Sequence, residues 1–459
     1  MIRRNRGIDM RHRTVALCLG LGTLLAGAVT ALPRGLADAL PAPVTDEDFP
    51  PVDLDEARLG QLLFYDPVLS GNGEVACATC HHPAFGTSDG LSLGLGDGGS
   101  GLGTARVTDA ANMPTERIPR NAQSLFNVGA LEYVAMFHDG RIEVDANRAT
   151  GFRTPLEDEM VAGFDTLLAA QTMFPVLSAD EMAGHYSENP ISRAVRQGVL
   201  TGEGGAWDLI SRRVSDIPDY AAAFAAVYPE IATPEDIGFT DISNALGAFI
   251  THEWRSDTAP FDAVLRGEAD LTGAALAGAE LFYGVAGCAS CHAGAFLTDH
   301  DYHATGVPQI GPGKAPAFEG THRDEGRYRV TGDPADLYAF RTPSLRNVAL
   351  TAPYGHDGAY ADLAAFVAAH GQGAAALEAY EITEAVLPAL EVDDLVIQGN
   401  AEERAAIAAA AVTWPALAPD EVAAIVAFLD TLTDPVVAQG RLGIPAAVPS
   451  GLPIPTPAP

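Results

Sequence analysis

Two copies of one short cysteine and histidine motif carry the chemistry of this chain. Residues 77–81 read Cys-Ala-Thr-Cys-His, and residues 288–292 read Cys-Ala-Ser-Cys-His. This spacing is the signature of c-type haem attachment, because two thiols can form thioethers with one porphyrin and the next residue offers an imidazole to its iron. A redox-active pair would not need the histidine, and a zinc site would need a second ligand pair nearby. We therefore predict two covalently bound c-type haems, held by Cys77, Cys80 and His81 and by Cys288, Cys291 and His292.

The fifth cysteine, Cys18, lies in an N-terminal segment that has the features of a secretory signal peptide. Five arginines within residues 1–13 precede an apolar run from Val15 to about Leu32, and a small-x-small site ends at Ala39. We expect residues 1–39 to be cleaved and the protein to reach the periplasm, where bacteria attach c-type haem. A lipoprotein anchor at Cys18 is disfavoured by its place early in the run. A retained membrane anchor is disfavoured because the run is barely long enough to span a bilayer.

The chain is strongly acidic. It has 60 Asp and Glu against 27 Lys and Arg, and Lys314 is its only lysine. The formal charge of −33 argues against binding to nucleic acid or an anionic membrane and favours a cationic partner, such as a basic electron donor. A high acidic load also keeps an exported protein soluble, so the charge does not identify a donor.

Helical patterns surround both motifs. An amphipathic helix is expected just before each one, over 57–64 and 277–282, as in a cytochrome c domain. Strand-like runs are few, and the glycine-rich stretch 86–103 predicts a loop over the first haem. We expect a mainly α fold with two cytochrome c-like haem domains and long loops. Further helical patterns occupy about 188–229, 240–255, 361–380 and 401–432. The expected boundaries are 40–258 for the N-terminal domain, 259–434 for the C-terminal domain and 435–459 for a Pro-rich tail, extended or disordered.

Several short motifs follow one another in a fixed order along residues 52–434. They are Phe64–Ser70, Arg120–Asn121, Phe137–Arg141, Gln171–Pro175 with Glu181–Met182, Phe340–Val348 and Leu350–Gly358. In these motifs the chain resembles the bacterial di-haem cytochrome c peroxidase and MauG superfamily. The resemblance implies a peroxide-reactive haem in the first domain and an electron-relaying haem in the second.

A haem that splits peroxide needs an open iron position. In many members a histidine on the glycine-rich loop blocks this haem until the enzyme is reduced. The corresponding residue here is Leu95, and no histidine occurs between His82 and His138. His82 directly follows His81 and would have to swing around the ring to reach the opposite face. We therefore predict a five-coordinate first haem in the resting protein.

Two residues are expected to act on peroxide. In the family a glutamine stands four residues before a proline and a glutamate stands six after it, and Gln171, Pro175 and Glu181 reproduce both intervals. Glu159, followed by a methionine, makes a rival, but residues of about 142–168 look like an insertion. We expect Glu181 to move the proton, with a pKa raised by burial beside the haem.

The second haem needs a sixth ligand if it relays electrons. The family's ligand, usually methionine or tyrosine, falls 14 residues after the histidine of the His-Asp-Gly motif, and counting from His356 reaches His370. All seven methionines lie at or before Met182. Histidine in place of methionine should lower the potential of this haem. The rival ligands are Tyr354, Tyr360 or another histidine.

Two further positions follow from the resemblance. A calcium ion between the domains would be bound by the side chain of Asn121 and the carbonyl groups of Thr351 and Pro353, which are oxygen ligands of the kind that calcium prefers. His138 stands where a tryptophan usually lies between the haems.

Three functions fit these features. The leading one is a periplasmic di-haem peroxidase that reduces hydrogen peroxide to water with electrons from a small redox protein, a cytochrome c or a cupredoxin. The second is a MauG-like enzyme that oxidatively modifies a side chain of a partner protein. Leu95 and the absence of a methionine ligand favour the second, and the loss of the tryptophan weighs against it. The third is an electron-transfer cytochrome, which would not need Gln171 or Glu181. A homodimer is the usual state in the family.

Overall fold

The structure is a computed structural model that describes residues 34–314, 322–412, 414–437 and 440–457. Most of the expected signal peptide, residues 1–33 with Cys18, lies outside the described residues. Among the described helices, none is both long and apolar enough to cross a bilayer.

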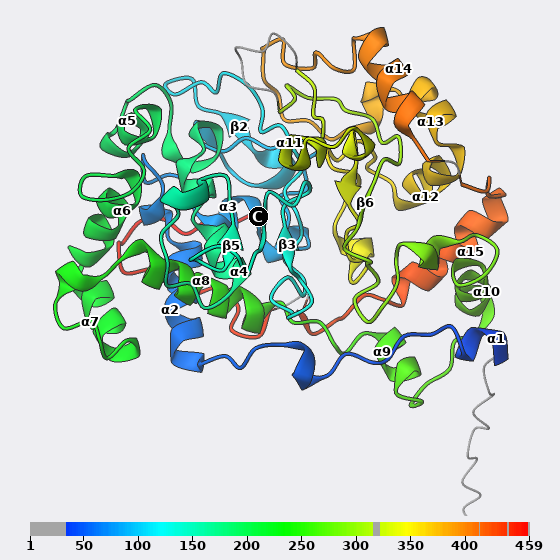
Figure 1. Cartoon of the computed structure of the whole chain (residues 1–459), viewed down its shortest axis with the longest axis horizontal. Helices are drawn as coiled ribbons and strands as arrows, with labels where there is room; N and C mark the ends of the chain where they lie inside the picture. The colour runs from blue at the N-terminus through cyan, green and yellow to red at the C-terminus, as the bar shows by residue number, and fades with distance from the viewer. Residues whose placement is uncertain (1–33, 315–321, 413, 438–439, 458–459) are drawn as a thin grey trace, which may run out of the picture. The chain divides into compact units, whose positions relative to one another are not determined.

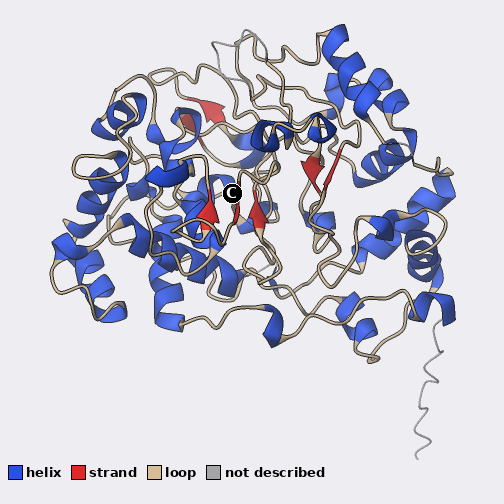
Figure 2. Cartoon of the chain, viewed as in Figure 1, coloured by secondary structure: helices blue, strands red, loops and turns tan. Residues whose placement is uncertain are grey.

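The fold is mainly helical, with a few short strands and long connecting loops (Figure 2). The strands form three small antiparallel sheets, β1–β2, β3–β4–β5 and β6–β7. The helices of the first half are α1 (Arg34–Ala37), α2 (Leu54–Tyr65), α3 (Cys77–Cys80), α4 (Leu167–Thr172), α5 (Pro190–Arg196), α6 (Ala206–Ser215), α7 (Pro218–Val227) and α8 (Phe239–Glu253). Those of the second half are α9 (Pro260–Leu265), α10 (Gly273–Phe282), α11 (Tyr328–Thr331), α12 (Leu363–Gln372), α13 (Ala374–Ala379), α14 (Ala401–Ala410) and α15 (Pro419–Asp430). The strands are β1 (Gly99–Ser100), β2 (Val107–Thr108), β3 (Ala135–Met136), β4 (Ile142–Val144), β5 (Phe152–Arg153), β6 (Tyr302–His303) and β7 (Phe340–Arg341).

The helix before each cysteine motif packs against a later helix of the same half. α2 packs on α8, and α10 packs on α15 (Figure 1). A Cβ atom added at Gly60 would lie 1.8 Å from the carbonyl oxygen of Ala245, and one added at Gly278 would lie 1.9 Å from that of Ala424. At each contact only glycine lets the two helices approach so closely. The α2–α8 and α10–α15 crossings therefore have the same construction.

Aromatic pairs at the two helix crossings also correspond to each other. Four residues after each glycine, Phe64 meets Phe249 and Phe282 meets Phe428, with ring centroids 5.2 and 5.1 Å apart. All four side chains are buried. The matching pairs lie in two different apolar clusters, one around α2 and α8 and the other around α10 and α15. The first half and the second half therefore each have a core of similar construction.

We expect Gly278→Ala to destabilise the protein, because the added methyl group would overlap the Ala424 carbonyl and push α10 away from α15. Overpacking of this kind costs about 1–3 kcal/mol and occasionally more. Denaturant unfolding of the haem-loaded protein measures the loss. Gly399→Ala is the control, since its Cβ would meet nothing closer than the Val396 carbonyl at 3.8 Å. Equal effects of the two changes would contradict this account of the crossing.

Most of the expected helices are present, but glycine and proline divide the long ones. The pattern over 188–229 forms α5, α6 and α7, with a glycine-containing turn after α5 and a proline at the first position of α7. The pattern over 401–432 forms α14 and α15. Apart from the two-residue strand β1, the glycine-rich stretch 86–103 is a loop as predicted, and it contains no helix longer than one turn.

The tail after Asp434 runs back over the first half in extended form. Val437 and Val448 are buried in the first apolar cluster, and the hydroxyl group of Ser450 donates a hydrogen bond of 2.6 Å to Asp66. Of the two forms expected for this segment, extended and disordered, the described residues show the extended one.

Candidate haem and peroxide site

One cavity of about 460 Å³ reaches both cysteine motifs. Its walls come from α3, α4, α12 and the loops between them, so residues far apart in sequence share one space. From the first half it is lined by Cys77, Cys80, His81, Gln171 and Glu181, and from the second by Cys288, Cys291, His292 and His370.

The histidine of each motif is oriented by a backbone carbonyl. His81 Nδ1 lies 3.0 Å from the Thr87 oxygen, and His292 Nδ1 lies 3.2 Å from the Leu297 oxygen. Since a carbonyl can only accept, Nδ1 carries the proton and donates it. Nε2 therefore keeps the lone pair that a metal ligand needs.

The residues present fit two c-type haems. The four motif cysteines are free thiols and face the same cavity as the two histidines. Burial lowers the pKa of His81 and, together with the nearby His370, lowers the pKa of His292 to about 4. Both imidazoles are thus neutral, which is the form that binds a metal.

His370 reaches the second motif from α12. Its Nδ1 lies 2.9 Å from the Phe366 carbonyl oxygen, so this ring too has its Nε2 lone pair free. Burial lowers the pKa of His370. The structure thus brings His370 and His292 into one part of the cavity.

The two rival tyrosines lie in different places. Tyr354 lines the cavity and stacks on Phe366, with ring centroids 5.9 Å apart. Tyr360 belongs to a separate apolar cluster around Leu93 and Ile310. Tyr354 is therefore the rival that needs a direct test.

Glu181 and Gln171 lie together with the first motif. Gln171 is in α4, and Glu181 is on a single π-helical turn, Ala179–Ala183, a local form common at functional sites. The glycine-rich loop closes over this turn, because a Cβ atom at Gly96 would lie 2.2 Å from the Asp180 carbonyl oxygen.

The charge environment of Glu181 suits proton transfer. Burial raises its pKa, and the positive charges of Lys314 and then Arg141 oppose that rise. A carboxyl group with a raised pKa can both take up and return a proton at moderate pH.

Glu159, Leu95 and His82 do not line this cavity. Glu159, the rival acid, is exposed. Leu95 is buried, and Gly94 rather than Leu95 lines the cavity. His82 accepts a hydrogen bond of 3.1 Å from the Ala84 backbone at the start of a short 3₁₀ turn, and it does not line the cavity.

A buried ion-pair network joins the two halves beside the cavity. Arg120 donates to Asp139 at 2.8 Å and to both oxygens of Asp324 at 2.6 and 2.7 Å, and Arg141 donates to Asp139 at 3.0 Å. Burial alone would raise the pKa of Asp324, but Arg120 holds it down at about 2. The arginine side chains therefore face fixed carboxylates from both halves.

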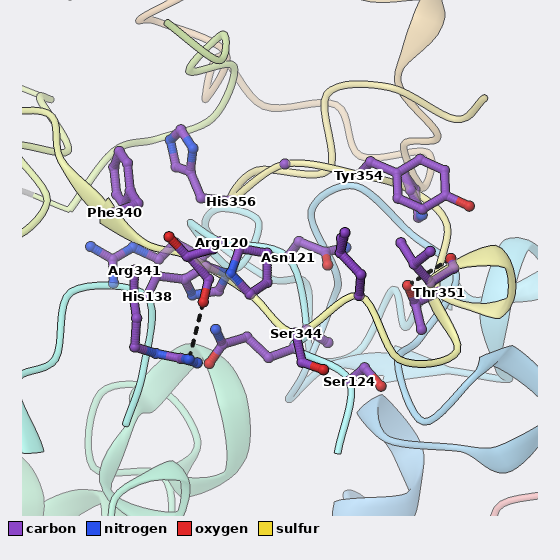
Figure 3. A pocket seen from close by; sticks show the side chains of 18 of the residues that line it. Arg120, Asn121, Ser124, His138, Phe340, Arg341, Ser344, Thr351, Tyr354 and His356 are labelled. Carbon is purple, nitrogen blue, oxygen red and sulfur yellow. Dashed lines mark hydrogen bonds between the residues drawn. The ribbon is translucent and has the colours of Figure 1, made fainter. Parts of the chain in front are cut away.

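His138 lies within this region and lines the cavity. Burial, and then the charge of Arg120, lowers its pKa well below the ordinary value, so its ring is neutral. Its backbone oxygen accepts a hydrogen bond of 2.7 Å from the Arg341 amide. Close by in Figure 3, the rings of Phe340 and His356 stack with centroids 3.8 Å apart.

The three residues expected to bind calcium also line the cavity. The Asn121 amide nitrogen donates to the Leu91 carbonyl at 2.7 Å, and its oxygen accepts no hydrogen bond from any described residue. Thr351 and Pro353 line the cavity wall as well, and Figure 3 shows Asn121 and Thr351.

Sequence reasoning missed the charged residues around Glu181. Arg141 stands in the motif Phe137–Arg141, but the motif assigned it no role. Asp324 gave no signal, because ion-pair partners that are distant in sequence, such as Arg120 and Asp324, leave no local pattern. Lys314 did carry a signal, since a chain with a single lysine invites the question of where that lysine lies.

Known proteins resemble this chain in both sequence and structure. A family model described as di-haem cytochrome c peroxidase matches residues 55–270. The chain is 30% identical over 317 residues to the methylamine utilization protein MauG of Methylorubrum extorquens, and this alignment covers 69% of the present chain and 68% of MauG. It is 27% identical over 426 residues to the cytochrome c551 peroxidase of Pseudomonas aeruginosa, and that alignment covers 90% of the present chain and 92% of the peroxidase.

A solved structure shares the fold over most of both chains. It is that of a MauG-like protein associated with microbial copper homeostasis, with a TM-score of 0.56 and 27% identity, covering 87% of this chain and 94% of that one.

Proposed function

Because the chain belongs to the di-haem cytochrome c peroxidase and MauG family, we propose that it reduces hydrogen peroxide to water with electrons from a small redox protein, a cytochrome c or a cupredoxin. The observation that carries the proposal is that Glu181 and Gln171 line the same cavity as Cys77, Cys80 and His81. An electron-transfer cytochrome would have no need of a proton-moving acid beside a haem.

Membership of this family implies two c-type haems. In our proposal the first is attached to Cys77 and Cys80 within 40–258 and the second to Cys288 and Cys291 within 259–434. The free thiols and the carbonyl-bound Nδ1 atoms of His81 and His292 support this assignment.

Glu181 is the proton carrier in the proposed reaction. The first haem, when bound, would supply the redox chemistry. Glu181 takes a proton from one peroxide oxygen and gives it to the other, so that the oxygen that departs leaves as water. Gln171 has an amide that can both donate to and accept from peroxide, which suits an orienting role.

The second haem would be the entry point for electrons, and His292 and His370 would hold its iron. Both rings carry their proton on Nδ1, and both side chains line the same part of the cavity, which supports this assignment. His138, with the Phe340 and His356 stack, lies in the region that joins the two motifs.

The runner-up is a MauG-like oxidation of a partner protein. Leu95 favours this function, because it stands where a blocking histidine lies in many members. A first haem that needs no prior reduction is a feature of MauG-like members. The 30% identity to a MauG also keeps it open.

Steady-state assays separate the two functions. The haem-loaded protein is given peroxide with a reduced c-type cytochrome, or with the product of a neighbouring gene, and the second protein is then examined by mass spectrometry. Fast cytochrome oxidation with an unmodified neighbour supports the peroxidase. A new mass on the neighbour with slow cytochrome oxidation would favour the runner-up instead.

We expect the resting ferric protein to be partly high-spin and to bind cyanide without prior reduction. The reason is that Leu95 replaces the blocking histidine and His82 is held away from the cavity. Electron paramagnetic resonance of the protein as isolated measures this. A spectrum of two purely low-spin haems would speak against an open first site.

Three further parts of the proposal await tests of their own. Calcium bound by Asn121, Thr351 and Pro353 would be revealed by metal analysis before and after chelation. Cleavage after Ala39 and export to the periplasm would be revealed by the N-terminus of the protein recovered from cell fractions. A homodimer would be revealed by light scattering.

A further inference from the structure

The only lysine of the chain lies at the cavity that holds Glu181, although the mechanism above does not use it. Lys314 is half-buried and lines the cavity together with Glu181, Gln171 and Arg141. All 26 other basic residues are arginines. Partial burial of an ammonium group is costly unless the group gains a partner, so its position asks for an explanation.

The described residues just before Lys314 are held by hydrogen bonds. The Ile310 amide donates to Asp357 at 2.9 Å, and His322 Nδ1 lies 3.1 Å from the Pro312 carbonyl oxygen. The loop also touches the first half, since a Cβ atom at Gly311 would lie 2.5 Å from the Leu93 side chain. A segment of the second half thus places the Lys314 side chain at the cavity that Glu181 of the first half also lines.

The ammonium group of Lys314 has no partner of its own among the described residues, with which it makes neither an ion pair nor a hydrogen bond. The charges that act on it are Arg141 and Arg120, which oppose its protonation, and Glu181 and Asp324, which favour it. Burial, followed by the two arginines, lowers its pKa to about 8. At neutral pH it is therefore a cation that faces the cavity lined by Glu181.

We propose that Lys314 makes this cavity a binding site for small monovalent anions, with the hydroperoxide ion as the natural one. The inference rests on the peroxide function proposed above. Hydrogen peroxide gives one proton to the Glu181 carboxylate, and the Lys314 ammonium neutralises the hydroperoxide ion that remains. The proton on Glu181 can then pass to the oxygen that leaves as water. The two proton transfers change no oxidation state, whereas breaking the O–O bond takes two electrons, which the first haem would supply when bound.

Azide is the probe, because it is a small monovalent anion that needs no turnover. Spectral titration of the resting haem-loaded protein gives its Kd. We expect Lys314→Met to raise the azide Kd about tenfold or more, as the loss of a charge-assisted contact does, and Lys314→Arg to stay within about threefold of the wild type. Imidazole, a neutral ligand, should bind all three proteins alike. Arg212→Gln, at an exposed arginine on α6, is the control.

The pH dependence gives a second measurement. Azide affinity of the wild type should fall as pH rises through about 8, and that of Lys314→Met should not. Because the chain has one lysine, ¹³C reductive methylation labels a single side chain, and its titration can be followed by NMR without reference to activity.

The outcomes are distinct. An azide Kd unchanged in Lys314→Met overturns the proposal, and if the haem spectrum shifts as well, Lys314 pairs with a porphyrin carboxylate instead. Equal losses in the Met and Arg variants also overturn it, because the charge would then be irrelevant. If the wild type binds azide as expected but turns over no peroxide, the proposed function fails and the anion site stands.

Discussion

Glu181→Gln is expected to lower peroxide turnover by a factor of about 10²–10⁴, the usual contribution of a general acid–base group. A neutral amide cannot take a proton from one peroxide oxygen and return it to the other. The substitution keeps the size of the side chain, so both haems should stay attached and spectroscopically close to normal. Steady-state turnover with a reduced c-type cytochrome measures the defect.

The matched control for this experiment is Glu159→Gln. Glu159 is exposed and away from the cavity, so its change should be nearly silent. A crippled Glu159→Gln beside a normal Glu181→Gln would show that the active site is misplaced.

The pH dependence of wild-type turnover tests the direction of the pKa shift of Glu181. The carboxylate is the form that accepts the proton, so turnover should fall as pH drops through the pKa of Glu181. Because burial raises that pKa, the loss should begin at a higher pH than for an exposed glutamate.

His370→Met is expected to raise the reduction potential of the second haem by on the order of 0.1 V or more, since axial ligands set haem potentials over a range of about 0.8 V. The thioether of methionine favours the reduced iron relative to imidazole. The low-spin signal should change, while attachment through Cys288 and Cys291 persists. Spectroelectrochemistry of the purified protein measures the shift.

Tyr354→Phe is the companion variant, because Tyr354 is the rival that lines the same cavity. It should leave both the potential and the low-spin signal nearly unchanged. The opposite pattern, a silent His370→Met and a strong effect of Tyr354→Phe, would assign the iron to the tyrosine.

Much of the site could be predicted because its signals are local or follow fixed intervals. The two cysteine motifs are each five residues long. The intervals from Gln171 through Pro175 to Glu181 can be counted in the sequence whatever the length of the surrounding loops. The helices before the motifs follow from their apolar periodicity. The repeated glycine at each helix crossing could be read from the sequence, but its closeness to a carbonyl could not.

The rest depends on contacts that no local pattern encodes. Arg120 and Asp324 are 204 residues apart and meet only because the two halves pack together. Lys314 reaches the cavity of Glu181 on a loop of the second half. The calcium residues, Asn121 and Thr351, came from family resemblance alone, because one amide and two carbonyl groups form no recognisable motif.

The count of electrons consumed per peroxide tests the central claim most directly. Haem-loaded protein that has never been reduced is mixed with limiting hydrogen peroxide and an excess of reduced c-type cytochrome. We predict two cytochromes oxidised for each peroxide, without a lag, because reduction of peroxide to water takes two electrons and the first site needs no activation. Peroxide loss with no matching cytochrome oxidation, or no peroxide loss at all, would contradict the account.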